Sequence, residues 1–182
     1  MMTCLNCNIT TNNAQCFNIL IFPLEEVRKY KNKYENMVNI EECFEYYQKK
    51  DYMTGENQIY CNHCNSISNS YYEVKLIVCP KILVINLNRG KGLQFDVKLQ
   101  FEEYLDIKNF IFYEDSPNYY ELIGVVTHFG SSDMSGHFIA YCKSFIDLKW
   151  YKYNDSQVNI SSFEEVCSTG VPYILFYSYI ER

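Results

Sequence analysis

From residue 71 onward, apolar side chains alternate with polar ones or form short runs, a pattern typical of β-strands. These segments are rich in Val, Ile, Tyr and Phe, and clusters of Pro, Gly, Asn, Asp or Ser separate them. We expect strands at Tyr71–Val78, Ile82–Leu87, Leu93–Phe101, Tyr119–Thr127, His137–Phe145, Leu148–Tyr153 and Tyr173–Tyr179. So many short strands in about a hundred residues predict an antiparallel, meandering sheet.

Other segments are less regular. A short strand is expected at Cys16–Leu24, whose apolar run is stopped by proline. The lysine-rich segment Glu25–Asn36 is predicted to be a solvated loop. Near the C-terminus a short helix is expected at Ser161–Val166, where Ser161 can cap the helix with Glu164 three positions on.

A helix is predicted to begin at Asn39. The Asn39 side chain and Glu42, at the third helical position, can satisfy the first free backbone N–H groups reciprocally. The helix is expected to end between Lys49 and Tyr52. Its apolar residues recur at helical spacing and form one packing face: Ile40, Cys43, Phe44 and Tyr47. Together the elements predict an α+β domain, rich in strands, with a cysteine-bearing appendage on its N-terminal side.

Composition narrows the classes of function. The 182 residues carry 16 Lys and Arg against 22 Asp and Glu, a net charge of −6, which argues against nucleic acid as the main partner. No apolar run reaches the roughly 18 residues of a membrane span, and the start of the chain has no secretory signal pattern. We expect a soluble, cytoplasmic or nuclear protein. Its nine cysteines are an odd number, which favours reduced thiols over a disulfide framework.

Four of the cysteines form two C-x-x-C pairs. Cys4 and Cys7 make the first pair, and Cys61 and Cys64 make the second. Each pair can place two thiolates on one tetrahedral metal ion, so the two together predict a structural zinc site that joins two distant hairpins. The alternatives are a redox motif, which lacks its usual position before a helix, and coincidental buried thiols. His63 could also serve as a ligand, although within such a turn it is expected to face solvent.

The remaining five cysteines are interpreted as small buried apolar residues. They are Cys16, Cys43, Cys79, Cys142 and Cys167.

The stretch from Leu122 to Ser156 carries the candidate chemistry. An apolar strand ends at His128, a polar loop follows, and His137 opens the next strand. Asn154 and Asp155 stand at the end of the paired strand, so His137 and Asn154 are expected to face each other at one sheet edge. A histidine oriented by an amide or carboxylate is half of a nucleophilic site. A structural role is the alternative for His137, and it is the preferred interpretation for His128.

Several longer motifs follow one another along the chain. They are the pair CLNC, the capped segment VNIEECFEYY, the run GENQIYCNHC, the strands KLIVCPKILVINLNR, and VVTHFGSSDMSGHFIAYCKS through WYKYNDS, followed by PYILFYSY. Read together and in this order, they resemble the C-terminal two thirds of the catalytic domain of ubiquitin-specific proteases. That family comprises cysteine proteases that remove ubiquitin, and the resemblance covers nearly the whole chain.

The resemblance implies a papain-like cysteine-protease fold with β-rich fingers and palm. Residues 1–85 would form a zinc-bearing fingers subdomain with an inserted helix at 39–50, and residues 86–182 a palm of antiparallel strands. Zinc would be held by the four paired cysteines, and ubiquitin and ubiquitinated proteins would be the partners. In the palm, His137 would be the general base, Asn154 the third catalytic residue and Asp155 a supporting group. The loop 129–136 would gate the channel for the ubiquitin tail.

Two departures from the family pattern have consequences. The strand that usually ends in Leu-Lys-Arg-Phe reads Leu87-Asn88-Arg89-Gly90 here, so its packing is open to question. The family's thumb segment, with the nucleophilic cysteine and oxyanion donors, has no counterpart in this sequence, so this chain alone is expected to be inactive. Its palm face is then expected to be exposed and to favour self-association. The alternatives are a non-catalytic ubiquitin-binding or scaffold module and a purely structural zinc-clip protein.

Overall fold

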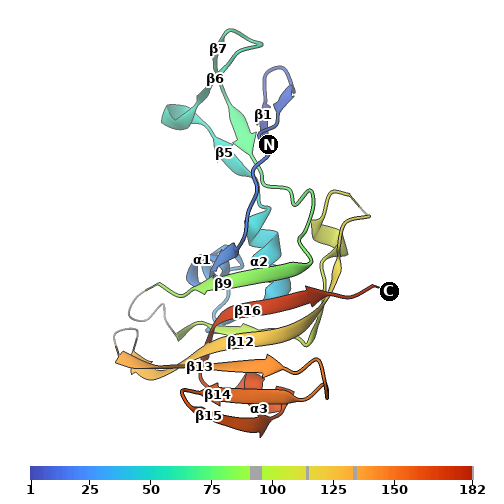
Figure 1. Ribbon diagram of the computed structural model, residues 1–182. Helices are drawn as coiled ribbons and strands as arrows, with labels where there is room; N and C mark the ends of the chain where they lie inside the picture. Colours follow the sequence, from blue (N-terminus) through green and yellow to red (C-terminus); the bar gives the residue numbers. More distant parts are fainter. Residues whose placement is uncertain (91–95, 114, 133–134, 182) are drawn as a thin grey trace.

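The protein is built around one large, twisted β-sheet. A computed structural model describes residues 1–90, 96–113, 115–132 and 135–181 (Figure 1). The sheet has eight strands in the order β15-β14-β13-β12-β16-β9-β3, with β11 also paired to β12. The bounds are β3 Leu20–Pro23, β9 Ile82–Asn88, β11 Tyr104–Asp106, β12 Tyr119–Ser132, β13 Ser135–Lys143, β14 Trp150–Asn154, β15 Gln157–Ser161 and β16 Val171–Tyr179.

The structure confirms most of the predicted strands but corrects the topology. The sheet is not wholly antiparallel, because β3 runs parallel to β9, and β10 (Lys98–Gln100) runs parallel to β4 (Met37–Asn39). Parallel neighbours need a long connection between them, and both pairs have one. The predicted strand Tyr71–Val78 shrinks to β8 (Ser70–Tyr72), and β15 was not predicted. Part of the predicted strand Leu93–Phe101 lies outside the described residues.

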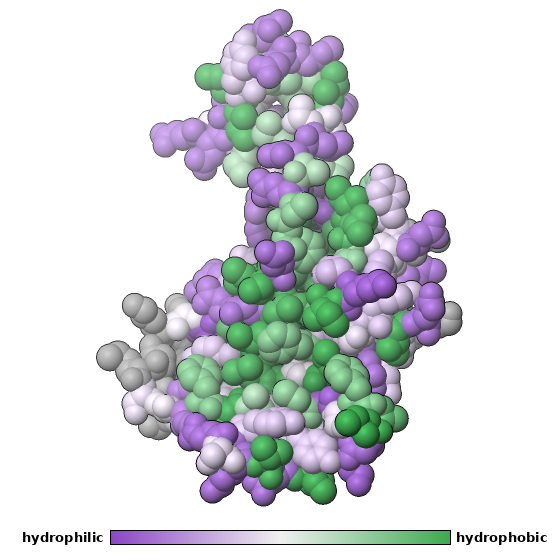
Figure 2. Space-filling model, viewed as in Figure 1, coloured by the Kyte–Doolittle hydropathy of each residue, from purple (hydrophilic) through white to green (hydrophobic). Residues whose placement is uncertain are grey.

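The two faces of the sheet differ in burial, and the cross-strand register shows which residues share a face. One row is buried on the side of the sheet that the helices cover: Leu20, Ile85, Leu175, Val125 and Tyr141. The neighbouring row points the other way and is apolar yet accessible: Ile21, Ile174, Val126, Ala140, Tyr153 and Val158, with Asn86 among them. Figure 2 shows apolar residues gathered over this second face.

Helix α1 (Leu24–Tyr30) occupies the start of the segment predicted to be a solvated loop, so that prediction was wrong. Leu24 and Val27 lie one turn apart on the same side and are completely buried, which fixes the helix against the sheet. The charged residues that suggested a loop cover its outer side, where Arg28 pairs with Glu25 at 2.8 Å.

Helix α2 (Ile40–Tyr47) begins where the sequence predicts. The Asn39 side chain accepts a hydrogen bond from the Glu42 backbone at 2.8 Å, and the Glu42 carboxylate accepts one from the Asn39 backbone at 2.9 Å. The helix ends earlier than predicted, at Tyr47, with Gln48 as its C-cap. Cys43 and Phe44 are fully buried against the sheet.

Helix α3 (Phe163–Ser168) starts one residue later than predicted. Ser162, not Ser161, is the N-cap, and its side chain accepts a hydrogen bond from the backbone of Glu165. Ser161 instead ends β15 and donates its hydroxyl to the Glu165 carboxylate at 2.9 Å. A capped helix is therefore present as predicted, but its start depends on where the unpredicted strand β15 ends.

Short strands form a smaller unit that projects from one end of the sheet (Figure 1). Its four-stranded sheet contains β1 (Met2–Cys4), β2 (Thr10–Thr11), β8 and β5 (Asp51–Met53), and a separate hairpin joins β6 (Ile59–Cys61) to β7 (Ser66–Ser68). The predicted division between residues 85 and 86 falls inside β9, while β3 and both N-terminal helices pack on the central sheet. None of the helices in the described ranges is long and apolar enough to cross a membrane.

The Asn39 cap should contribute measurably to stability. Asn39→Ala removes the acceptor for the Glu42 N–H, so we expect the free energy of unfolding to fall by about 1 kcal/mol. Asn39→Asp keeps an oxygen acceptor and should stay within a few tenths of a kcal/mol of the unmodified chain. Chemical denaturation of the three proteins compares them directly. Equal stability of the alanine and aspartate variants would show that the cap does not contribute to the free energy of unfolding.

Candidate functional site

The four paired cysteines come together at the tips of two hairpins. Cys4 ends β1 and Cys7 lies in the connection to β2, while Cys61 ends β6 and Cys64 lies in the turn before β7. The four sulfur atoms all lie within 4.8 Å of one another, and none forms a disulfide. The Cys4 and Cys64 sulfurs are 3.9 Å apart, and those of Cys7 and Cys61 are 3.8 Å apart.

This arrangement fits a tetrahedral zinc ion. Sulfur ligands at about 2.3 Å from zinc at the corners of a tetrahedron lie about 3.8 Å from one another. The two turns are built alike, since a residue with positive φ follows each second cysteine: Asn8 at 58° and Asn65 at 51°. His63 is exposed, as expected for a residue inside such a turn.

Backbone groups of the turns act on the thiols. A hydrogen bond from the backbone of Cys7 lowers the pKa of Cys4 to about 6, and the Cys64 N–H donates to the Cys61 sulfur at 3.5 Å. Hydrogen bonding with the Cys7 thiol raises the pKa of Cys64 to about 12. The Cys4 thiol therefore loses its proton more readily than the Cys64 thiol. A bound metal ion would have to displace the protons that remain on the cluster.

The predicted histidine pair joins the start of β13 to the end of β14. The His137 Nε2 atom lies 2.6 Å from the Asn154 Oδ1 atom. The pairing of Tyr141 with Lys152 sets this register, and both members of the pair lie on the helix-covered side of the sheet at its edge. Because an amide oxygen only accepts, Nε2 carries the proton in this bond. The lone pair of a neutral ring is then on Nδ1.

Asp155 lies beside this pair in the turn from β14 to β15. Its Oδ2 atom is 3.8 Å from His137 Nε2, too far for a hydrogen bond but close enough for an electrostatic contact. Asp155 has a φ of 51°, a left-handed conformation that aspartate tolerates better than most residues. Its side chain is 81% exposed, so solvent screens its charge strongly.

Sequence reasoning missed the support of this edge by α3. Lys152, two residues before Asn154, pairs with Glu165 of α3 at 3.1 Å, and the Tyr141 hydroxyl donates to the same carboxylate at 3.3 Å. These contacts fix the strands that carry the histidine pair to the helix. The alternation along β14, which puts Lys152 on the same face as Asn154, was the available signal.

His128 does not end its strand, which corrects the prediction. Strand β12 continues to Ser132, and β13 begins at Ser135, so most of the predicted loop 129–136 is strand, with an irregular register between Phe129 and Ser132. Residues 133–134 lie outside the described residues. His128 is 4% exposed, consistent with a structural role, and its ring lies 4.9 Å from that of Phe138. A Cβ atom added at Gly136 would come within 2.1 Å of His128 Nε2, so only glycine fits beside His137.

The unusual Leu87-Asn88-Arg89-Gly90 segment is well packed. Leu87 is buried, and Arg89 is only 3% exposed. The Arg89 guanidinium donates to the backbone oxygens of Pro172 at 2.7 Å and Val97 at 2.6 Å, which ties β9 to the start of β16. Burial lowers the pKa of Arg89 to about 10, so it remains protonated at neutral pH.

The five other cysteines do not all pack as predicted. Cys43 and Cys79 are buried, but Cys16, Cys142 and Cys167 are exposed, because their positions face away from the core. Burial raises the pKa values of Cys43 and Cys79, the latter to about 11. Partial desolvation also raises the pKa values of Cys142 and Cys167. Cys142 lies five residues after His137 on β13, so the alternation of side chains along the strand points it to the opposite face.

Known proteins match both the sequence and the fold. The model of the ubiquitin carboxyl-terminal hydrolase family matches residues 2–177. Ubiquitin carboxyl-terminal hydrolase 25 of Arabidopsis thaliana is 31% identical over 180 residues, which are 96% of this chain and 25% of that protein. Ubiquitin carboxyl-terminal hydrolase 8 of Saccharomyces cerevisiae is 32% identical over 153 residues, 75% of this chain and 32% of that protein.

Two solved structures share the architecture. The SAGA DUB module of Ubp8, Sgf11, Sus1 and Sgf73 bound to monoubiquitin matches with a TM-score of 0.79 and 29% identity, over 99% of this chain and 39% of the matched chain. A yeast SAGA DUB module with a variant Sgf73 gives a TM-score of 0.77 at the same identity and coverage. The chain spans about a quarter to two fifths of these relatives. Because the family model covers nearly its whole length, this chain belongs to the ubiquitin carboxyl-terminal hydrolase family.

Proposed function

We propose that the chain is the zinc-holding and histidine-bearing part of a deubiquitinating thiol protease. The reaction is hydrolysis of the peptide or isopeptide bond after the C-terminal glycine of ubiquitin. The observation that carries the proposal is the 2.6 Å bond between His137 Nε2 and Asn154 Oδ1, in a chain of the ubiquitin carboxyl-terminal hydrolase family. An oriented histidine with its Nδ1 lone pair available is what a thiol nucleophile needs.

In the proposed mechanism, His137 Nδ1 accepts the proton of the nucleophilic thiol. The thiolate attacks the carbonyl carbon, and the leaving amine takes the proton from the imidazolium as the carbon–nitrogen bond breaks. Water then attacks the acyl-enzyme with His137 as its base, the carbon–sulfur bond breaks, and the ubiquitin carboxylate leaves as His137 returns the proton to the thiolate. Asn154 holds the imidazole in one tautomer and orientation, and the Asp155 carboxylate favours the transient positive charge.

We infer that the nucleophile comes from a segment outside residues 1–182. Four of the cysteines form the metal cluster, and Cys43 and Cys79 are buried. Cys142 lies on the wrong face of the sheet, and its raised pKa disfavours the thiolate. The Cys167 pKa is raised as well, and Cys16 precedes β3, which lies at the opposite edge of the sheet from β14 and β15. These properties support a separate source for the thiol.

Ubiquitin is the proposed partner. The matched structure of Ubp8 with its module contains bound monoubiquitin. The net charge of −6 suits a partner whose C-terminal tail carries arginines, because opposite charges speed association more than they fix affinity. The projecting hairpins would cradle the body of ubiquitin, and the β12–β13 hairpin end would gate the channel for its tail.

The catalytic role predicts a selective loss of activity. In a protein that joins this chain to the nucleophile, His137→Ala should lower kcat for a fluorogenic ubiquitin C-terminal reporter by at least about a thousandfold, because the general base is lost. Asn154→Ala should lower it less, since the ring keeps its basic nitrogen. Lys149→Ala, at an exposed residue in the turn at the other end of the β13–β14 hairpin, is the control and should retain full activity. Near-normal cleavage by His137→Ala would favour a non-catalytic ubiquitin-binding module.

The cysteine cluster is proposed to hold structural zinc. We expect one zinc ion per chain by elemental analysis, and a bound ion should hold the two hairpins together. Cys61→Ser should abolish stoichiometric zinc and collapse the amide NMR dispersion of residues 59–68, while the central sheet stays folded. Cys16→Ser, at an exposed cysteine outside the cluster, should keep both zinc and dispersion. Metal-free protein with ordered hairpins would contradict the proposal.

The exposed face of the central sheet is proposed to cause self-association of the isolated chain. Val158 and Ile160 on edge strand β15 extend the accessible apolar rows and are 54% and 67% exposed. Light scattering should show a mass that rises with concentration, and the double variant V158K/I160K should shift it toward monomer. Ile67→Lys, at an exposed residue of the projecting unit, should leave association unchanged. A strictly monomeric chain at millimolar concentration would refute this.

A further inference from the structure

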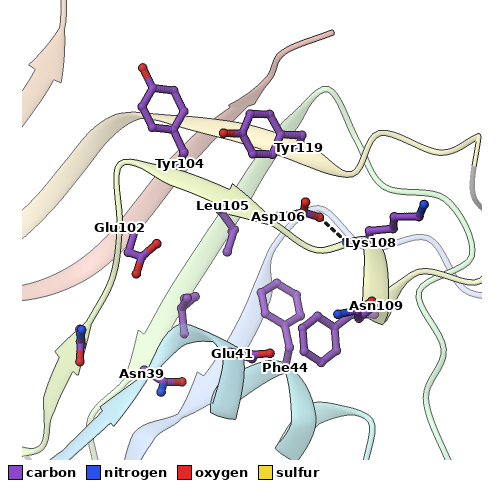
Figure 3. Close-up of a pocket in the computed structure, with 13 residues that line it drawn as sticks. Asn39, Glu41, Phe44, Glu102, Tyr104, Leu105, Asp106, Lys108, Asn109 and Tyr119 are labelled. Atoms are coloured by element: carbon purple, nitrogen blue, oxygen red, sulfur yellow. Dashed lines mark hydrogen bonds between the residues drawn. The ribbon is translucent and has the colours of Figure 1, made fainter. Parts of the chain in front are cut away.

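A second concave site lies between α2 and the segment that follows β10. Its cavity has a volume of about 630 Å³, within the range of ligand pockets. None of the residues that line it belongs to the histidine pair or to the cysteine cluster. In Figure 3, side chains from α2 and from β11 converge on this space from opposite sides.

The floor of the pocket is apolar and aromatic. Ile40, Phe44 and Leu105 are buried beneath it, and the ring of Phe44 stacks on that of Phe110 with centroids 5.1 Å apart. On one side Tyr104 and Tyr119 stack at 6.1 Å, nearly parallel. A ligand that lies here would cover apolar carbon and ring surface.

The rim is acidic. Glu41 of α2 and Glu102 before β11 face the space from opposite sides, with Asp106 further along, and Lys108 is the basic side chain of the lining. Glu41 and Glu102 are exposed at the mouth, and in the part of the chain that the structure describes their carboxylates make no hydrogen bond or ion pair. At the start of α2 the capping box occupies the N–H groups of Asn39 and Glu42 and adds the negative charge of the Glu42 carboxylate.

We propose that this pocket binds an arginine or lysine side chain from a basic peptide segment of a partner protein. The methylene groups of such a side chain would cover the apolar floor, and its cationic head would reach Glu41 and Glu102. The tyrosine pair offers ring faces that attract a cation. The volume exceeds that of one side chain, so neighbouring residues of the peptide would enter as well. This inference does not depend on the proposed protease activity.

The test uses the capped tripeptide acetyl-Ala-Arg-Ala-amide as the probe, titrated into the chain and followed by amide NMR shifts. We expect saturable shifts at Glu41, Glu102 and Tyr104, and binding at least about fivefold weaker for the citrulline analogue, which is uncharged. The double variant E41Q/E102Q should bind at least about tenfold more weakly and unfold at an unchanged temperature, since both carboxylates are exposed. Glu56→Gln, which removes one carboxylate charge on the projecting unit and outside the pocket, should bind normally.

Three results would overturn the proposal. Equal affinity for the arginine and citrulline peptides would show that the charge of the bound side chain does not contribute to binding. Unchanged binding by E41Q/E102Q would place the cation elsewhere. Saturable shifts of the same amides by inorganic phosphate, without shifts by the arginine peptide, would make the pocket an anion site.

Discussion

The register of β13 against β14 is the constraint on which the candidate site depends. Tyr141 pairs with Lys152, and this alignment brings His137 Nε2 to 2.6 Å from Asn154 Oδ1 at the open end of the hairpin. A shift of one residue would turn His137 to the opposite face of the sheet and separate the pair. Strand pairing, rather than the conformation of a loop, therefore determines the geometry of the site.

Packing on both sides of that hairpin holds the register. Tyr141 is fully buried. The Glu165 carboxylate of α3 accepts a hydrogen bond from the Tyr141 hydroxyl and pairs with the ammonium of Lys152. On the other flank β12 pairs with β13 up to Ser132, and His128 fills the space that Gly136 leaves open. The buried row that crosses the sheet from Leu20 to Tyr141 joins this edge to α1 and α2. Packing in the core thus holds the strand register that sets the geometry of the site.

Local signals in the sequence were read correctly where neighbours in the chain decide the structure. The capping box at Asn39 and the hairpin that pairs His137 with Asn154 are of this kind. Helix α1 was missed because Leu24 and Val27 are two apolar positions in a charged run, and only burial against a distant sheet makes them decisive. The parallel pairing of β3 with β9 and the anchoring of Arg89 on Pro172 join residues far apart in the chain, which no local pattern encodes.

The central claim is that Asn154 fixes His137 with its proton on Nε2, leaving Nδ1 as the base. Nitrogen NMR of the His137 imidazole, measured in the neutral ring with one-bond proton couplings, tests this most directly. The account predicts a protonated Nε2 and an unprotonated Nδ1, and a mixture of the two tautomers in Asn154→Ala. A neutral ring with its proton on Nδ1 would contradict the account.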